Sequence, residues 1–367
     1  MQIQIPFPKI YFLFFFSLMI STASDCKKST DKPPFVPPSE KSDTIRTFLN
    51  PIGSNSGIID IGDPYVLKYG NAYYMYATSS GSGFKVWHSA NMVDWTEKGL
   101  ALDKNNAANN WGAGNFWAPE VKYYDGKFYM TYSAIGINGK MKIRIARSDN
   151  PLGPFINYSE PFFNGDNFSY IDGNLFFDNN SIFLYYVKDC SENIIDNKHT
   201  SQIFVVQMDN SIKNFIGSPV LILQPDQEWE NPNSDWRWNE GPYVMKHNDL
   251  YYLTYSANVY SSIDYAVGYA TATSPMGTWT KYSENPILKK DINLRVSGPG
   301  HNSITSSLDD TELFIVYHTH TYFDNPSGNR NMCIDRMVFE NGVMKVIGPT
   351  RTPQPLPSGV LYRLIPK

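Results

Sequence analysis

The chain has 367 residues, a formal net charge of −4 and a sequence pI near 5.9. Its charges are mixed and include no long basic run, which excludes the electrostatic footprint of a nucleic-acid-binding protein. Aromatic residues make up 15% of the sequence, and this excess suits both β-strands and surfaces that stack on sugar rings.

The first 25 residues have the layout of a signal peptide. Lys9 precedes an apolar run over residues 10–20 that is too short to span a bilayer, and small residues follow it. Cys26 comes next and resembles the lipid-acceptor cysteine of bacterial lipoproteins, although Asp25 departs from the small residue which that signal prefers. We therefore predict export, as a periplasmic or outer-membrane lipoprotein anchored through Cys26 or as a secreted protein without an anchor.

Residues 26–56 are predicted to form a disordered tether, because Lys, Ser, Asp and Pro dominate this stretch up to about residue 46. The folded domain is expected over residues 57–367. Only Cys190 and Cys333 remain besides Cys26, which excludes a disulfide framework. We expect both thiols to be buried and inert.

Five related segments follow one another along the predicted domain. Each has a polar entry, an aromatic and β-branched strand, a turn and a second strand, and they recur at roughly the period of propeller blades. A β-sandwich would give no reason for a repeated polar entry. The sequence therefore predicts an all-β, five-bladed β-propeller. The five entries are Gly62-Asp63-Pro64, Ala118-Pro119-Glu120, Ile171-Asp172-Gly173, Glu240-Gly241-Pro242 and Gly298-Pro299-Gly300-His301.

In a propeller the innermost strand of every blade points its entry toward the central axis, so one residue per blade can line a common funnel. Glycoside hydrolysis requires one protonated and one ionised acid at the same pH. The repeat supplies such acids at the expected place. The residues aligned there are Asp63, Glu120 or its neighbours, Asp172, Glu240 and His301.

These motifs, together with Trp117 before Ala118 and Asn239 before Glu240, resemble glycoside hydrolase family 43, the five-bladed pentosidases and arabinanases. The resemblance runs from about residue 57 to the C-terminus. It implies an inverting mechanism in which Asp63 is the general base and Glu240 the general acid. Asp172 is implied to tune and orient Glu240, since a nearby carboxylate raises the pKa of a second one.

Several further residues are candidates for substrate binding. Trp117 offers a flat ring for a sugar face, with core packing as the alternative. Arg330 is similar to the arginine that many family members aim at the substrate and the catalytic carboxylates; an ordinary surface arginine is the alternative. Trp238, with Trp236, is expected to shape the leaving-group side. Two other tryptophans, Trp87 and Trp95, are expected to be structural.

His301 is similar to the axial histidine that faces a central calcium ion through its water shell in many family members. Calcium prefers oxygen ligands, so a direct bond is not expected, and a buried hydrogen-bonded histidine is the alternative. His318 and His320 are interpreted as strand residues, because a zinc site would need a third ligand that the sequence does not offer. No organic cofactor is expected.

The predicted function is an exo-acting α-L-arabinofuranosidase, a monomer acting on arabinan, arabinoxylan or a related glycan. β-Xylosidase and endo-arabinanase are alternatives within the family. Because residues 361–367 follow shortly after the fifth repeat, we expect no additional sandwich domain of the kind that many β-xylosidases carry. Two alternatives belong to other classes, a non-catalytic glycan-binding surface lipoprotein and a propeller that serves as a protein-interaction platform.

Overall fold

A computed structural model of the chain describes residues 46–53 and 58–360. The predicted signal peptide (1–25), Cys26 and most of the predicted tether therefore lie outside the described residues. Within the described part, no helix is long and apolar enough to cross a membrane.

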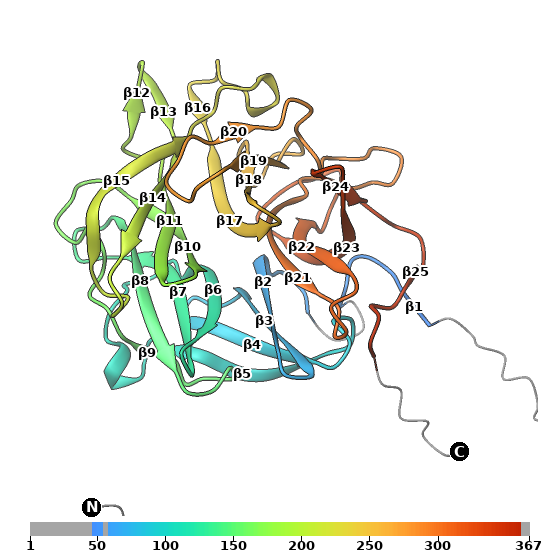
Figure 1. The fold of residues 1–367 in the computed structure, drawn as a ribbon, viewed down its shortest axis with the longest axis horizontal. Helices are drawn as coiled ribbons and strands as arrows, with labels where there is room; N and C mark the ends of the chain where they lie inside the picture. The colour runs from blue at the N-terminus through green and yellow to red at the C-terminus, as the bar shows by residue number, and fades with distance from the viewer. Residues whose placement is uncertain (1–45, 54–57, 361–367) are drawn as a thin grey trace, which may run out of the picture. The chain divides into compact units, whose positions relative to one another are not determined.

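Strands make up most of the described residues, and the all-β prediction is confirmed (Figure 1). Five sheets have four strands each, all antiparallel, which we number sheets 1 to 5 in chain order. Sheets 1 and 2 contain β2 (Gly62–Tyr69), β3 (Ala72–Thr78), β4 (Gly83–Ser89) and β5 (Trp95–Asp103), then β6 (Trp117–Tyr124), β7 (Lys127–Ile135), β8 (Met141–Ser148) and β9 (Ile156–Asn157). Sheet 3 contains β10 (Tyr170–Asp178), β11 (Ser181–Lys188), β14 (Gln202–Met208) and β15 (Phe215–Leu223). Sheets 4 and 5 contain β17 (Asn239–His247), β18 (Leu250–Ala257), β19 (Ala266–Ala272) and β20 (Thr280–Lys281), then β21 (Gly300–Ser306), β22 (Leu313–His320), β23 (Arg330–Glu340) and β24 (Val343–Ile347).

The first strands of these sheets form a closed cycle. β2 contacts β6, β6 contacts β10, β10 contacts β17, β17 contacts β21, and β21 contacts β2 again. Figure 1 shows these five strands gathered in the middle of the ribbon, with the later strands of each sheet farther out. This is the arrangement that a propeller requires, and each of the five sequence repeats begins one sheet.

The hydrophobic core lies between successive sheets. Apolar side chains of sheets 1 and 2 pack together, for example Tyr76 with Met130, and a further cluster joins sheet 5 to sheet 1 through Phe314 and Met75. The second strands are covered on both faces, so their sequences are almost continuously apolar instead of alternating. Trp87 and Trp95 belong to this core and are buried, as predicted.

The N-terminal boundary of the folded domain differs from the prediction. β1 (Thr47–Phe48) pairs with β25 (Gln354–Pro355), and the Ile52 amide donates to the Met332 carbonyl at 2.7 Å. Residues 46–53 are therefore folded, and the tether predicted over 26–56 is too long at this end. The apolar residues of this stretch stand singly among polar ones, so they give no periodic pattern, and their partners come from the other end of the chain.

A small additional sheet departs from the repeat. It contains β12 (Ile194–Ile195), β13 (Lys198–Thr200) and β16 (Trp236–Arg237), with β13 and β16 parallel. The hairpin of β12 and β13 is inserted between two strands of sheet 3, and Figure 1 draws it at the top of the view. Short 3-10 helices occur at η1 (Ala107–Asn109) and η2 (Glu228–Glu230).

Candidate active site

All five first strands break their pairing at the same place. Two residues near the start of each strand have no partner on the second strand, and the first of the two has a left-handed backbone. Bulges of this kind re-aim side chains at the rim of a sheet. The five left-handed residues are Asp63 (φ 55°), Ala118 (46°), Asp172 (57°), Gly241 (57°) and His301 (48°).

In two repeats the residue at the bulge differs from the acid that the alignment of the repeats placed there. Ala118 and Gly241, not Glu120 and Glu240, are the structural equivalents of Asp63. Glu240 comes one residue before its bulge and still reaches the pocket. Glu120 comes directly after its own bulge and is buried, with Oε2 accepting from Asn174 Nδ2 at 2.5 Å. Burial raises the pKa of Glu120 to about 7, against the opposing effect of nearby Lys122.

A pocket of about 340 Å³ brings together the seven residues to which the sequence analysis gave a catalytic, substrate-binding or metal-facing role, but not Glu120. Its walls come from the entries of the repeats, the additional sheet and the loop after β18. The lining residues are Asp63, Thr78, Trp117, Ile171, Asp172, Asp189, Cys190, Ser191, Trp236, Trp238, Glu240, Val259, Tyr260, His301 and Arg330.

Asp63 is surrounded by donors and positive charge. Its Oδ1 lies 2.7 Å from Arg330 Nη1 and 3.5 Å from His301 Nδ1, and its Oδ2 accepts from the Thr78 hydroxyl at 2.6 Å. Burial alone would raise the pKa of Asp63, but Arg330 and then His301 and His318 outweigh it and hold the pKa well below its usual range. Asp63 is therefore an ionised carboxylate at neutral pH.

Two neighbours fix the Arg330 guanidinium over Asp63. A Cβ on Gly62 would lie only 2.0 Å from Arg330 Nη2, so the glycine leaves the space that the guanidinium occupies. The Tyr260 ring faces the guanidinium at 5.1 Å, a distance at which cation–π attraction acts. The arginine is part of the pocket wall and not an ordinary surface residue.

Glu240 has the opposite environment. It is buried, and its Oε1 accepts from the Tyr265 hydroxyl at 2.7 Å. Burial raises the pKa of Glu240 well above its usual range, the negative charge of Asp172 raises it further, and the Tyr265 hydrogen bond opposes both in part. Gly300 makes this contact possible, because a Cβ there would lie 2.1 Å from a carbon of the Tyr265 ring. The environment of Glu240 therefore favours its protonated form.

Asp172 connects sheet 3 to the strand that carries Glu240. Its Oδ2 accepts from the Gly241 amide at 2.9 Å, and its own amide donates to the Ser133 hydroxyl at 3.1 Å. Burial raises the pKa of Asp172 to about 6, although His301 opposes the rise. The carboxylate thus holds the residue directly after Glu240, which is the position an orienting group requires.

The histidines divide into distinct roles. His318 is completely buried, its Nδ1 accepts from the Asp63 amide at 3.2 Å, and burial lowers the pKa of His318 so that the ring stays neutral. His320 contacts Ser297 and the Tyr260 carbonyl. No group of three His, Cys, Asp or Glu side chains that could hold a metal directly occurs in residues 46–53 and 58–360.

Direct metal coordination therefore does not fit the donor set around His301. The neighbouring Asn302 Oδ1 is buried without a hydrogen-bond partner, and such an oxygen suits a bound water or a hard cation. A water-mediated calcium ion facing His301 stays a prediction.

Three tryptophans line the pocket, Trp117 from β6 on one wall and Trp236 and Trp238 from the segment before Glu240 on another. Trp117 is 37% exposed. On the other wall, Trp236 is 44% exposed and stacks on His199 with ring centroids 3.7 Å apart, and Trp238 lies 6.2 Å from Trp236. The sequence alone left core packing open for Trp117; its exposure in the pocket favours a binding surface.

Some residues that line the pocket or hold its carboxyl groups were not predicted. Asp189 follows β11 and its negative charge raises the pKa of Glu240, but it lies outside the repeated entry and gave no motif. Tyr265 and Thr78 hold the two opposing carboxyl groups from neighbouring strands and loops. Cys190 lines the pocket and Cys333 does not; both are buried free thiols, and burial raises the pKa of each, as expected of inert cysteines.

Comparison with protein families gives a match to the glycosyl hydrolases family 43 model over residues 48–344. Among characterised relatives, an alpha-L-arabinofuranosidase 43 from Humicola insolens is 28% identical over 74% of this chain, and an extracellular exo-alpha-(1->5)-L-arabinofuranosidase from Streptomyces avermitilis is 30% identical over 76%. The aligned region spans 56% and 57% of these two relatives.

Solved structures give the same picture. A thermostable family-43 glycoside hydrolase is 55% identical with a TM-score of 0.82, and the match covers 85% of this chain and 99% of that protein. A structure described as an endo-1,4-beta-xylanase from Bacteroides thetaiotaomicron is 32% identical with a TM-score of 0.69, covering 82% and 97% of the two chains.

Proposed function

Because the chain belongs to glycosyl hydrolases family 43, we propose that it hydrolyses glycosidic bonds in pentose-containing glycans with inversion, as an exo-α-L-arabinofuranosidase. The observation that carries this proposal is the pair of opposed acids in one pocket. Asp63 has a pKa held low by Arg330, whereas burial and then Asp172 raise the pKa of Glu240. Two carboxyl groups whose environments separate their pKa values are what acid–base catalysis of this reaction requires.

In the proposed mechanism Asp63 takes a proton from a water molecule, and the water oxygen bonds to the anomeric carbon as the glycosidic bond breaks. Glu240 gives its proton to the departing oxygen. The products are a free sugar of inverted configuration and an alcohol; Asp63 then loses its proton to solvent and Glu240 regains one. Hydrogen bonds with His318 and Thr78 hold the orientation of Asp63, and the hydrogen bond of Asp172 with the Gly241 amide holds the orientation of Glu240.

The walls of the pocket supply substrate contacts in this proposal. Trp117 presents a ring on which the apolar face of a sugar can lie. Arg330 is placed to contact sugar hydroxyls as well as Asp63. Trp238 and Trp236 form the side that receives the leaving group.

The relatives named as arabinofuranosidases support arabinose as the released sugar. The structural neighbour described as a xylanase favours one alternative, a β-xylosidase acting on xylan-derived chains.

We also propose export, which the name of the extracellular Streptomyces relative supports. Lipidation of Cys26, a monomeric state and a calcium ion whose water shell faces His301 complete the proposal.

The first test is hydrolysis of para-nitrophenyl α-L-arabinofuranoside, β-D-xyloside and β-D-galactoside by the wild type and the Asp63→Asn variant. We expect release from the arabinofuranoside, lost in the variant. Release from the xyloside alone would favour the alternative, and equal activity of the variant would contradict the role of Asp63.

A further inference from the structure

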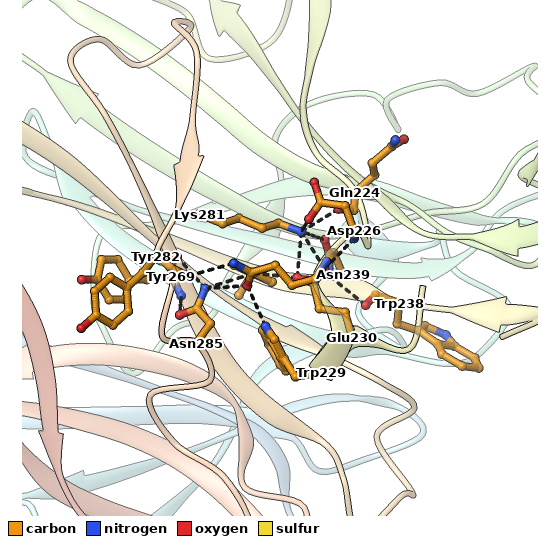
Figure 2. Close-up of polar contacts among 12 residues, drawn as sticks. Gln224, Asp226, Trp229, Glu230, Trp238, Asn239, Tyr269, Lys281, Tyr282 and Asn285 are labelled. Carbon is orange, nitrogen blue, oxygen red and sulfur yellow. Dashed lines mark hydrogen bonds and ion pairs between the residues drawn. The ribbon is translucent and has the colours of Figure 1, made fainter. Parts of the chain in front are cut away.

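Behind the pocket wall lies a buried ion pair that the mechanism does not use. Glu230 is completely buried, and its two carboxylate oxygens lie 2.7 and 2.8 Å from Lys281 Nζ, whose side chain is 7% exposed. Neither residue lines the pocket. Figure 2 shows the ammonium of Lys281 among Asp226, Glu230 and Asn239.

All the partners of this pair belong to the segment before Glu240 or to the strands beside it. Glu230 accepts from the amides of Asp226 and Gln227 at 2.7 and 2.8 Å, and from the Tyr255 hydroxyl at 2.6 Å. Lys281 also donates to the Gln224 carbonyl at 2.6 Å. The pair thereby ties the loop after β15 to β18 and β20.

Asn239 connects the ion pair to the general acid. Its side chain accepts from Lys281 at 3.2 Å, donates to Glu230 at 3.3 Å and donates to the Trp238 carbonyl at 2.9 Å. Residues next to each other on a strand point to opposite faces, so Asn239 faces the ion pair while Glu240 faces the pocket. A rotation of the peptide group between Asn239 and Glu240 would therefore change the orientation of both side chains.

The strand needs such an anchor at this point. Glu240 pairs with Ser256, but the next paired residue is Tyr243, because Gly241 and Pro242 form the bulge. Backbone pairing therefore holds Glu240 firmly only on its N-terminal side, where Asn239 lies. A buried ion pair is often no more stabilising than apolar residues of the same volume, so stability alone gives little reason for two charges here.

We propose that the Glu230–Lys281 pair is a positioning device that acts through Asn239 to fix the direction of Glu240 and of the Trp238 wall. This inference rests on the proposed function and adds residues outside the pocket to it. Loss of the pair misplaces the acid without removing it, so reactions that need protonation of the leaving group suffer most.

The test compares two substrates. One is an arabino-oligosaccharide, which has a poor leaving group. The other is the activated 2,4-dinitrophenyl α-L-arabinofuranoside, whose dinitrophenolate leaving group departs without a proton. The Glu230→Gln/Lys281→Met double variant removes both charges together, so no uncompensated charge stays buried. Asn239→Ala keeps the ion pair and removes only its connection to the strand. Because small displacements of catalytic groups are costly, we expect kcat on the oligosaccharide to fall about 10- to 100-fold in both variants. We expect kcat on the activated substrate to stay within about twofold, since general acid catalysis is not required there.

A matched control neutralises the ion pair of Glu312 with Arg336, whose Oε1–Nε distance is also 2.7 Å and whose other side-chain hydrogen-bond partners are backbone groups of residues 355–358, outside the pocket lining. Glu312→Gln/Arg336→Met should leave kcat unchanged on both substrates. Equal loss on both substrates, or loss on neither, in the Glu230 and Asn239 variants would overturn the positioning role. Wild-type enzyme that cleaves neither substrate would instead refute the proposed function, and the inference with it.

Discussion

Replacement of Arg330 by methionine should change the pH at which Asp63 acts as a base. The guanidinium is the largest of the charges that lower the pKa of Asp63, and it lies 2.7 Å from Oδ1. An opposite charge at such a distance lowers the pKa of a carboxyl group by about 1–3. The variant should therefore raise the pKa of Asp63 by about 1–3, equivalent to about 1.4–4 kcal/mol. Burial, which favours the protonated form, then acts with less opposition.

The sign of the effect on rate follows from the role of Asp63. A general base must be ionised, so kcat/KM rises with pH through the pKa of the base. In the wild type this acidic limb lies below the usual assay range, and in Arg330→Met it should move upward. The same shift affects stability. A lowered carboxyl pKa stabilises the fold above the unfolded pKa and this stabilisation is lost as the pH falls, so the variant should also unfold more readily in neutral solution.

The assay is the pH profile of kcat/KM on para-nitrophenyl arabinofuranoside, with the melting temperature measured at each pH. Gly62→Ala is the matched variant, because its Cβ would displace the guanidinium without removing the charge. It should give a smaller shift in the same direction. A uniform loss of kcat/KM at every pH, with the acidic limb unchanged, would show that Arg330 contacts only substrate and would refute this reasoning.

Three further predictions concern other parts of the site. Tyr265→Phe removes the hydrogen bond that lowers the pKa of Glu240, so the alkaline limb of the kcat profile should move to higher pH; a shift to lower pH would contradict the assignment. Trp238→Ala should lower kcat/KM on arabino-oligosaccharides about 10-fold or more while leaving para-nitrophenyl arabinofuranoside within about twofold, since the ring covers apolar surface of the leaving-group sugar, at about 25 cal/mol per Å² removed from water; equal losses would place Trp238 outside the leaving-group side. Chelation of calcium should lower the melting temperature, because a ligand bound only to the folded state stabilises it, and unchanged melting and activity would dispose of the calcium proposal.

The sequence was sufficient to predict the fold because the repeated residues lie in the strands themselves. Each entry and its following hairpin recur with the same order of apolar and turn residues, and five sheets follow from them. Asp63 and Asp172 were found for the same reason, since both occupy the repeated bulge. Their spacing and the family resemblance together identified the pocket.

The bulge itself could not be predicted, because a left-handed residue in a strand is a property of the backbone. The sequence therefore aligned Glu120 or its neighbours, and Glu240, with Asp63, whereas Ala118 and Gly241 occupy that position. Glu120 became a buried residue bound to Asn174, away from the pocket.

Residues that meet only through the closed cycle were also missed. Asp189 reaches the pocket, and Tyr265 reaches Glu240, from segments without any repeated motif. The same holds for the N-terminal residues, where the pairing of Thr47 with Pro355 joins opposite ends of the sequence. Contacts between residues so far apart leave no local pattern in the amino-acid sequence of either segment.

The most direct test of the mechanism is the anomeric configuration of the sugar when it is first released, followed by proton NMR before mutarotation. If Asp63 activates a water molecule that attacks opposite the leaving group protonated by Glu240, the first product has inverted configuration. A first product of retained configuration would contradict this mechanism, because it would require a carboxylate to bond to the sugar in place of water.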